Sequence, residues 1–257
     1  MIERVLAPNP GPMTGSGTNT YLVTDADGQV AVIDPGPNEA SHLDAIQAAA
    51  APLGRITTVL VTHRHHDHLP AALPLSARTG AVLAGHPQLP GVQWPLADGQ
   101  RCFGSLVALH TPGHTRESVC FWDGAEGALF TGDLVAGAGT VIVDDEPGGL
   151  SQYVRSLQRL LELGPRSIYP GHGPRVDDAP GKLNEYLAHR RQREQQILQV
   201  LAARRASTVD GLVGAIYTET PPGLLPMAAR NVRATLDKLE AEGRVRRAGN
   251  DQWQATT

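Results

Sequence analysis

Cysteine, aromatic residues and long apolar runs are all scarce in this sequence. Its two cysteines, Cys102 and Cys120, both lie in apolar, strand-like stretches. We expect buried free thiols, since two cysteines allow one disulfide at most and nothing indicates it. The N-terminal stretch "MIERVLAPNPGP" lacks a basic segment followed by an apolar run, and no apolar stretch is long enough to span a bilayer. These absences argue against a secreted or membrane-bound protein, and a cytoplasmic location is expected.

Two common catalytic and binding devices are missing as well. The sequence has no G-x-S-x-G motif, which excludes the serine nucleophile elbow of α/β-hydrolases. The stretch "NPGPMTGSGTNTYLV" is rich in glycine, but it has neither P-loop nor Rossmann spacing. We therefore expect it to form a loop near the mouth of a cleft and not a nucleotide cradle.

The region from residue 20 to about 172 predicts a layered α/β domain. Short runs rich in Val, Ile and Leu alternate with segments in which apolar residues follow helical spacing, as from Leu43 to Leu53 and from Tyr153 to Leu161. Ser151 is expected to cap the second of these helices. The predicted strands are 21–23, 30–33, 57–61, 82–84, 105–109, 119–122, 128–130 and 167–169.

A smaller second domain is expected after a linker at residues 177–181, "DDAPG". A long helix with Arg190, Arg191 and Arg193 on its exposed side, two further helical patterns and a hairpin follow in the order of a winged helix. A capping-box-like start at "STVD" opens the second helix. We place a catalytic domain at 1–180 and a winged-helix-like domain at 181–257. The second holds 12 Lys+Arg and 8 Asp+Glu, leaving 10 basic and 18 acidic residues in the first, so their surfaces differ in charge.

Side chains that bind metal ions follow four of the predicted strands. The strand 57–61 runs into "THRHHDHL", and the later strands run into "HTPGHT", "TGD" and "PGHG". Strand-end loops are where a rigid scaffold presents functional groups, and imidazole and carboxylate are donors that Zn²⁺ favours. Burying so many titratable groups without a cation would be costly. The four segments together predict a metal site.

These segments resemble the signature of the metallo-β-lactamase superfamily. Its H-x-H-x-D-H motif stands here at residues 63–68, and "TPGHT", "TGD" and "PGHG" follow in the family's order to about residue 175. The resemblance implies a four-layered αβ/βα sandwich with two Zn²⁺ ions, or Fe or Mn, at one edge of two facing sheets. It implies that the ligands are His63, His65 and His114 for the first ion, Asp67, His68 and His172 for the second, and Asp133 for both.

The same resemblance also implies roles for residues that lie next to the predicted ligands. Arg64 and His66 occupy the two variable positions of the motif, so His66 is expected to point away from the metals. Asp34, in "VIDPG", stands where the family has an aspartate that supports the ligand loop. Asp67 and Asp133 are the candidate catalytic carboxylates.

A two-metal site of this kind predicts a hydrolase. Two cations about 3.5–4 Å apart hold a shared water and lower its pKa towards about 7, giving a bridging hydroxide at neutral pH. That hydroxide attacks a carbonyl or a phosphorus, and the metals stabilise the negative oxygen that develops. True β-lactamases of the superfamily lack Asp133 at this place, so its presence favours the general hydrolase branch over antibiotic resistance.

The substrate is the least determined feature. The N-terminal stretch, the ligand motif and the winged helix together look most like the β-lactamase-like protein 2 group, described as zinc-dependent endoribonucleases, which favours single-stranded RNA. Basic residues of the second domain support RNA, although packing on the catalytic domain or homodimer formation explains them equally well. They are Arg230, Arg233, Lys238, Arg244, Arg246 and Arg247.

Other features count against RNA and keep two alternatives open. The catalytic region is acidic, including Asp144, Asp145 and Glu146, and only 4% of the residues are aromatic, whereas single-strand binders stack bases on several aromatics. Hydrolysis of a small thioester, ester or lactone, as by hydroxyacylglutathione hydrolases, would use the same seven ligands. A winged-helix regulator with a metal-binding sensor domain is less favoured, because seven ligands exceed what a sensor requires.

Overall fold

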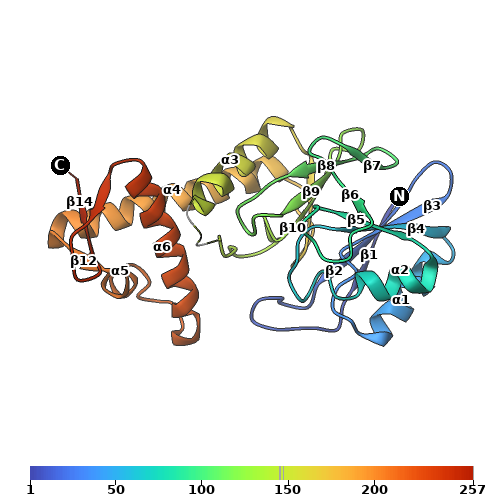
Figure 1. Ribbon diagram of the computed structural model, residues 1–257, viewed down its shortest axis with the longest axis horizontal. Coiled ribbons are helices and arrows are strands. Elements are labelled where there is room, and N and C mark those ends of the chain that lie inside the picture. Colours follow the sequence, from blue (N-terminus) through green and yellow to red (C-terminus); the bar gives the residue numbers. More distant parts are fainter. Residues whose placement is uncertain (145, 147, 257) are drawn as a thin grey trace.

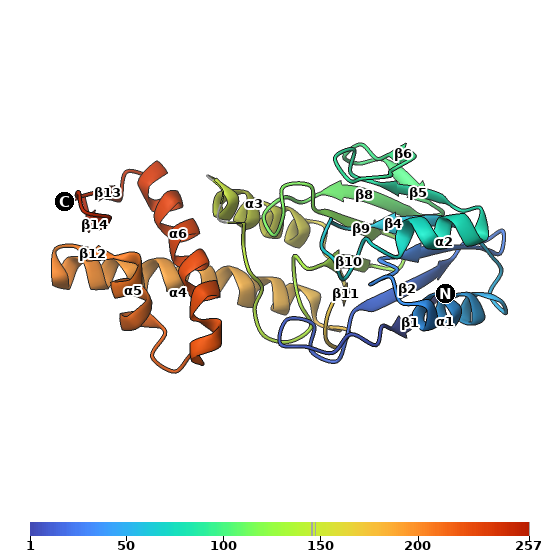
Figure 2. The same cartoon turned by 60° about the horizontal axis from the view of Figure 1, so that its bottom comes forward.

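The computed structural model describes residues 1–144, 146 and 148–256. The molecule is elongated, with a sandwich of two sheets at one end and a smaller group of helices and short strands at the other (Figures 1 and 2). The long helix α4 (Ala179–Arg204) runs between the two parts.

The first sheet has the strand order β1-β2-β3-β4-β5-β6. Its strands are Ile2–Leu6, Asn19–Thr24, Gln29–Ile33, Arg55–Val61, Val82–Gly85 and Trp94–Pro95. The second sheet has the order β11-β10-β9-β8-β7. Its strands are, in chain order, Arg101–Phe103 (β7), Leu106–His110 (β8), Val119–Asp123 (β9), Ala128–Gly132 (β10) and Ser167–Pro170 (β11). All eight predicted strands are confirmed within a few residues. The strands β1, β6 and β7 were not predicted, because β1 has no continuous apolar run and the other two are only two or three residues long.

Three apolar layers hold the sandwich together. The helices α1 (Ala40–Ala50) and α2 (Ala72–Thr79) pack on the outer face of the first sheet through a cluster that includes Ile46 and Leu75. Phe121 and Phe130 belong to the layer between the two sheets. On the far side α3 (Gly149–Glu162) and α4 cover the second sheet. This is the αβ/βα sandwich that the family resemblance implied.

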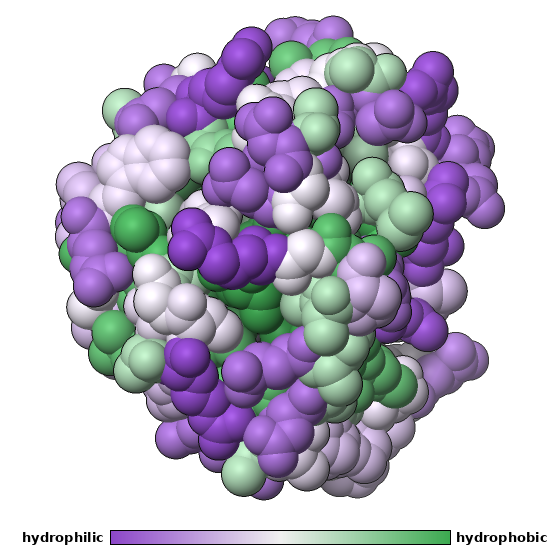
Figure 3. Space-filling view, turned by 90° about the vertical axis from the view of Figure 1, so that its right-hand side faces the viewer, coloured by the Kyte–Doolittle hydropathy of each residue, from purple (hydrophilic) through white to green (hydrophobic). Residues whose placement is uncertain are grey.

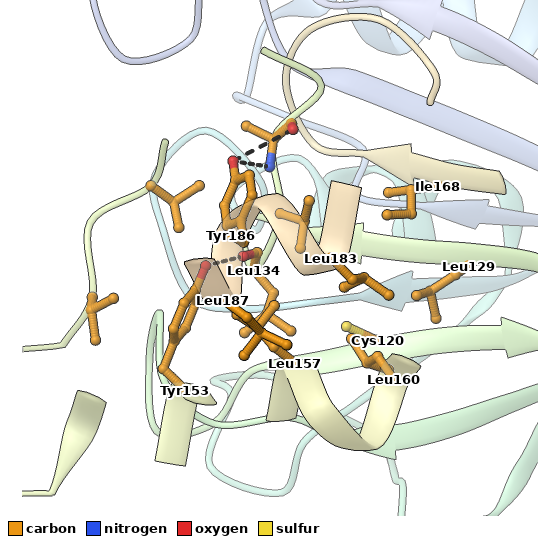
Figure 4. Packing of buried hydrophobic residues seen from close by; sticks show 14 of the residues in the cluster. Cys120, Leu129, Leu134, Tyr153, Leu157, Leu160, Ile168, Leu183, Tyr186 and Leu187 are labelled. Atoms are coloured by element: carbon orange, nitrogen blue, oxygen red, sulfur yellow. Dashed lines mark hydrogen bonds between the residues drawn. The ribbon is translucent and has the colours of Figure 1, made fainter. Parts of the chain in front are cut away.

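Tyrosines in the outer layer also position the chain that follows β10. Tyr153 Oη donates a hydrogen bond to the backbone oxygen of Leu134 at 2.8 Å, and the backbone N–H of Ala136 donates to Tyr186 Oη at 3.1 Å (Figure 4). Both phenol rings are buried, so the segment after β10 is anchored to α3 and α4. The expected cap of α3 was wrong: Ser151 lies inside the first turn, and Gly148 precedes the helix at φ 83°.

The expected linker at 177–181 was also wrong. Asp178 caps α4 by accepting a 2.9 Å hydrogen bond from the backbone N–H of Gly181. The first half of α4 packs in the core of the sandwich through residues such as Leu183, and the second half packs in the C-terminal core through residues such as Leu201. The boundary predicted at residue 180 therefore falls in the first turn of a helix that both domains share.

The C-terminal domain has the expected order of a winged helix. After α4 come β12 (Ser207–Thr208), α5 (Val209–Ile216), the 3₁₀ helix η1 (Pro222–Leu224), α6 (Leu225–Ala241), β13 (Val245–Arg247) and β14 (Gln252–Ala255). The short sheet has the order β12-β14-β13. α5 begins within the predicted "STVD" stretch, but its cap is Thr208 and not Ser207, because Thr208 Oγ1 accepts from the backbone N–H of Gly211 at 3.1 Å. β12 was not predicted, since two residues carry no periodicity.

Burial of three further residues tests the sequence predictions. Cys102 and Cys120 are buried free thiols, as expected. Arg190 was expected on the exposed side of α4, but only 4% of it is exposed. Its guanidinium donates to the backbone oxygen of Val141 at 2.8 Å and lies over the ring of Tyr153. Arg190 therefore joins α4 to the sandwich and is not part of the exposed surface.

The remaining surface is mixed in character. At the end of the sandwich that faces away from the C-terminal domain, hydrophobic residues stand in small groups among hydrophilic ones (Figure 3). Within the described part of the chain, no helix combines the length and apolarity needed to cross a membrane.

Candidate metal centre

The structure brings all seven predicted ligands to one edge of the two sheets. His63, His65, Asp67 and His68 follow β4 of the first sheet. His114 follows β8, Asp133 directly follows β10, and His172 follows β11, all in the second sheet. The strands β10 and β11 are parallel neighbours, so the loops after them emerge side by side. The sandwich thus supplies part of the cluster from each sheet.

The first group of donors consists of three imidazoles and one carboxylate. His65 Nδ1 lies 2.9 Å from His63 Nε2 and 3.0 Å from His114 Nε2. Asp133 Oδ2 lies 3.9 Å from His63 Nε2 and 3.7 Å from His114 Nε2. Nitrogens bound at about 2.0–2.1 Å to one tetrahedral zinc are about 3.3 Å apart, so the spacing of these donors fits a single ion.

The second group uses the other oxygen of the same aspartate. Asp133 Oδ1 lies 3.3 Å from His172 Nε2 and 3.4 Å from His68 Nε2. Asp67 Oδ2 lies 3.1 Å from His172 Nε2. Asp133 Oδ1 is buried and has no hydrogen-bond partner among the described residues. One carboxylate thus offers an oxygen to each group, which is the arrangement of a ligand that bridges two ions.

Backbone hydrogen bonds and a buried carboxylate hold the ligands in place. Asp34 Oδ2 lies 2.8 Å from His68 Nδ1 and accepts a 2.7 Å hydrogen bond from the hydroxyl of Thr62. His114 Nδ1 lies 2.8 Å from the backbone oxygen of Ile142. Each contact orients a ring nitrogen towards the cluster and fixes the ring that carries it. The supporting position expected for Asp34 is confirmed.

Two glycines let the backbone approach the cluster closely. A side chain at Gly171 would place its Cβ 2.6 Å from Asp133 Oδ1 and 2.7 Å from a ring carbon of His68. Gly132 has φ 49°, and a Cβ at this position would collide with the side chain of Thr62. The glycine of "PGHG" is therefore required by packing against two predicted ligands, and the glycine of "TGD" by packing against Thr62, which supports Asp34.

The electrostatics of the cluster suit cation binding. Burial acts to raise the pKa of Asp133, but His68 and His172 outweigh it and hold that pKa well below its usual range. Burial lowers the pKa of His172, yet the nearby carboxylates of Asp133 and Asp67 prevail and raise it to about 9. Burial and the neighbouring imidazoles lower the pKa of His63 and leave its ring neutral. Cation binding would therefore release protons from this site.

Residues beside the ligands point elsewhere. The side chain of His66 is 94% exposed, which confirms that it turns away from the cluster. Arg64 forms a 3.5 Å ion pair with Glu117, and Arg116 forms a 2.9 Å ion pair with Glu146. Both arginines are thus neutralised locally. Asp145 of the predicted acidic segment lies outside the described residues.

The cluster opens into a pocket of about 650 Å³ between the two domains. His114, Asp133 and His172 line one part of it, and Met13 from the N-terminal loop contributes to its wall, as expected of a loop at the mouth of a cleft. The C-terminal domain supplies the remaining wall through residues that include Arg193, Tyr217, Leu224 and Met227. No motif marks these residues, because only the packing of α4 against the sandwich brings them near the cluster.

Comparison with known proteins agrees with this geometry. The sequence pattern described as "Metallo-beta-lactamase superfamily" matches residues 13–101 and 90–172. The chain belongs to the metallo-beta-lactamase superfamily. Members of this superfamily are hydrolases, so the chain is a hydrolase, and the His/Asp cluster is its candidate metal-binding site. Residues 208–253 match the "Beta-lactamase associated winged helix domain", which confirms the predicted second domain type.

Two curated relatives match almost the whole metallo-beta-lactamase chain. The "Beta-lactamase-like protein 2 homolog" of Drosophila melanogaster is 37% identical over 95% of this chain and 89% of its own length. The "Atrochrysone carboxyl ACP thioesterase" of Claviceps purpurea is 33% identical over 98% of this chain and 85% of its own length.

Solved structures share the metallo-beta-lactamase fold. The metallo-beta-lactamase family protein TTHA1429 of Thermus thermophilus aligns with a TM-score of 0.82 at 24% identity, covering 99% of this chain and 98% of that one. TTHA1623, solved in a di-iron-bound form, aligns with a TM-score of 0.58 at 30% identity, covering 69% of this chain and 96% of that one.

Proposed function

We propose that the protein hydrolyses acyl thioesters and related esters at a centre of two zinc ions. The observation that carries this proposal is that the candidate metal centre opens into a pocket whose other walls are largely apolar. Met13 and Leu224 are large hydrophobic side chains that stay 53% and 37% exposed on this pocket. An apolar cavity with a few polar groups at one end suits an acyl chain better than a polyanion.

The seven side chains would hold the two ions as the sequence predicted. His63, His65 and His114 would take the first, and Asp67, His68 and His172 the second. Asp133 would bind both, because its two oxygens face the two groups. Two bound zinc ions would supply Lewis acidity and a water whose pKa falls to about 7. Iron or manganese would suit the same ligand types.

The protein's own residues would organise the reaction around that centre. Asp133 sets the separation of the two groups, and Asp34 keeps the ring of His68 turned towards the cluster. Asp67 stays ionised at neutral pH: burial acts to raise its pKa, but His172 and His68 outweigh it and lower the pKa to about 2. A thioester releases a thiolate, whose parent thiol has a pKa of about 8.5, so the leaving group needs no strong general acid. The walls of the pocket exclude water from the acyl chain.

The charges of the winged-helix domain weaken the case for RNA. Lys238 forms ion pairs with Glu194 at 2.8 Å and Glu242 at 2.6 Å. Arg244 pairs with the same two glutamates. Arg247 lies near Asp237 and Glu240 and over the ring of Trp253. Cations that are paired inside their own domain attract phosphates weakly.

Single-stranded RNA, favoured from the sequence alone, is the second candidate. The observation that supports it is the match to the "Beta-lactamase-like protein 2 homolog" of Drosophila melanogaster over both domains, the same group whose resemblance suggested RNA. A two-metal centre attacks phosphorus as readily as carbonyl carbon, so the cluster itself does not choose between the two substrates. The pocket and the paired cations favour the thioester.

One parallel assay tests the choice. Protein loaded with zinc would be given S-hexanoyl-N-acetylcysteamine, S-lactoylglutathione, an acyl-homoserine lactone and single-stranded RNA, with Asp133→Ala as the inactive control. We expect metal-dependent thioester cleavage that the control loses by at least about 10²-fold. RNA cleavage by the wild-type protein, with every thioester left intact, would reject the first candidate in favour of the second.

A further inference from the structure

One arginine of the interdomain pocket has no acidic partner among the described residues. Arg193 of α4 lines the pocket together with three ligands of the candidate metal centre. Its Nη1 donates to the side-chain oxygen of Gln196 at 2.8 Å, and its Nε lies 3.4 Å from His189 Nε2. Its guanidinium lies 4.5 Å from the ring centroid of Tyr217. Within the described part of the chain it forms no ion pair, and no hydrogen bond involves its Nη2.

The partners of Arg193 orient its charge without neutralising it. Gln196 and Tyr217 are uncharged at neutral pH. His189 is also neutral, because burial and the nearby Arg190 and Arg193 lower its pKa to about 4. Stacking on an aromatic ring and a hydrogen bond to an amide restrict the guanidinium to one orientation. The group is therefore a fixed positive charge that is left available to a ligand.

Other arginines nearby differ in this respect. Arg190 lies one turn earlier on α4, but its guanidinium is occupied by the backbone oxygen of Val141. Arg64 and Arg116, beside the metal ligands, pair with glutamates. Among the residues that the structure describes, the carboxylates that line the pocket are Asp133, within the metal cluster, and Glu219, which is exposed. Neither forms an ion pair with Arg193.

We propose that Arg193 binds an anionic group of the substrate, so that the pocket selects thioesters that carry a carboxylate or a phosphate away from the scissile bond. This inference rests on the proposed thioester hydrolysis. The reacting carbonyl would lie at the metal cluster, an apolar segment of the substrate would lie along Met13, Leu224 and Met227, and the anion would meet the guanidinium. Arg193 is thus a specificity-determining residue contributed by the helix that both domains share.

Two sources of the anion are chemically equivalent at the guanidinium. A dicarboxylic acyl group carries a carboxylate at the end of the acyl chain. A phosphopantetheine thiol carries a phosphate on the leaving-group side. A planar carboxylate and a tetrahedral phosphate each offer two oxygens that can accept hydrogen bonds from two N–H groups of one guanidinium. Substrates that place the charge on one side only distinguish the two sources.

The kinetic experiment compares three thioesters of six-carbon acids. S-hexanoyl-N-acetylcysteamine is neutral, S-adipoyl-N-acetylcysteamine carries its anion on the acyl side, and S-hexanoyl-4′-phosphopantetheine carries it on the thiol side. We expect one of the two anionic substrates to exceed the neutral one in kcat/KM by about tenfold or more. Arg193→Met, which keeps the aliphatic stem and removes the charge, should abolish that preference by lowering kcat/KM for the favoured anionic substrate about tenfold more than for the neutral one.

Matched variants separate recognition from structure. Arg193→Lys should retain part of the preference, because it keeps the charge without the planar fork. Arg191→Met removes the same charge from an exposed neighbour on α4 and should leave the preference intact. Equal loss on all three substrates in Arg193→Met would overturn the inference, as would a wild-type protein that does not discriminate among them.

A binding measurement keeps the inference testable if no thioester is cleaved. Calorimetric titration would compare 4′-phosphopantetheine with neutral pantetheine, and adipate with adipamide, on wild-type protein and on Arg193→Met. We expect at least one anion to bind, with about tenfold weaker binding to the variant. Binding of this kind without turnover would reject the proposed function and support the anion site. Failure of both anions to bind more tightly than their neutral counterparts would reject the site.

Discussion

The guanidinium of Arg190 donates a 2.8 Å hydrogen bond to the backbone oxygen of Val141. The next backbone oxygen, that of Ile142, lies 2.8 Å from His114 Nδ1 in the candidate metal centre. The backbone N–H of Val143 donates to the side-chain oxygen of Asn231 on α6 at 3.4 Å. A helix shared by both domains therefore holds the strip of chain that orients a metal ligand.

Replacing Arg190 should weaken both the fold and the metal centre. Arg190→Met leaves the buried oxygen of Val141 without its donor, so we expect the free energy of unfolding to fall by about 2–3 kcal/mol. Because Ile142 then holds His114 less firmly, affinity for the first ion should fall by about tenfold. Urea unfolding and competition with a chromophoric chelator would measure the two effects. Arg191→Met, on the exposed face of α4, serves as the control and should change neither.

Histidines that are neighbours in sequence should differ sharply in their effect on metal content. His66 is 94% exposed, so His66→Ala should keep two ions per chain. His68 is fully buried and faces Asp133 and His172, so His68→Ala should keep about one. Elemental analysis after gentle purification gives the ratio directly. Equal metal content in the two variants would contradict the assignment of ligands.

Asp34 should affect the binding affinity of the second ion through His68, although Asp34 is not itself a predicted ligand. Asp34→Asn keeps the shape of the side chain but removes the negative charge that faces His68 Nδ1 at 2.8 Å. We expect the affinity of the second ion to fall about 10- to 100-fold. Asp98→Asn is a suitable comparison, because Asp98 accepts hydrogen bonds from the backbone of His110 and from Arg159. That variant should change stability and leave metal affinity unaltered.

Acid should destabilise the domain contact in part through His189. Its pKa in the folded chain is about 4, lowered from 6.5 by burial first and then by Arg190 and Arg193. Between pH 6.5 and 4 the unfolded chain takes up a proton that the folded chain does not. The stability associated with neutral His189 is therefore complete above pH 6.5 and is lost as the pH falls towards 4.

The difference between wild type and His189→Gln isolates this effect. Protonation of the metal ligands also changes stability in acid, but it is common to both proteins and cancels in the comparison. We expect the urea midpoint of the wild type to fall more steeply than that of the variant from pH 6.5 to 4, and the two to run parallel above pH 7. Parallel curves across the whole range would show that His189 is not held neutral by its surroundings.

Much of the catalytic half was predictable because its signals are local. The turns after β4, β8, β10 and β11 each carry a predicted ligand, and a strand of Val, Ile and Leu that ends in such a turn is recognisable without any tertiary information. The prediction that His66 points outward followed from the family motif, in which residue 66 is a variable position. The errors were also local in origin: Ser151 and "DDAPG" looked like a cap and a linker, whereas Gly148 and Asp178 occupy the helix starts.

The sequence by itself determined the types, spacing and order of the candidate metal-binding residues, and through them the superfamily and its hydrolytic chemistry. These are properties of short segments, and they can be recognised in the sequence without knowing how distant parts of the chain pack. Only the tertiary structure decided that Arg190 is buried, that Lys238 is neutralised by Glu194, and that Arg193 faces the pocket of the candidate metal centre without a carboxylate partner in the described part of the chain. Whether an arginine is exposed, forms an ion pair or remains available to a ligand depends on which distant segments pack against it. The periodicity of apolar residues within one helix does not predict those contacts.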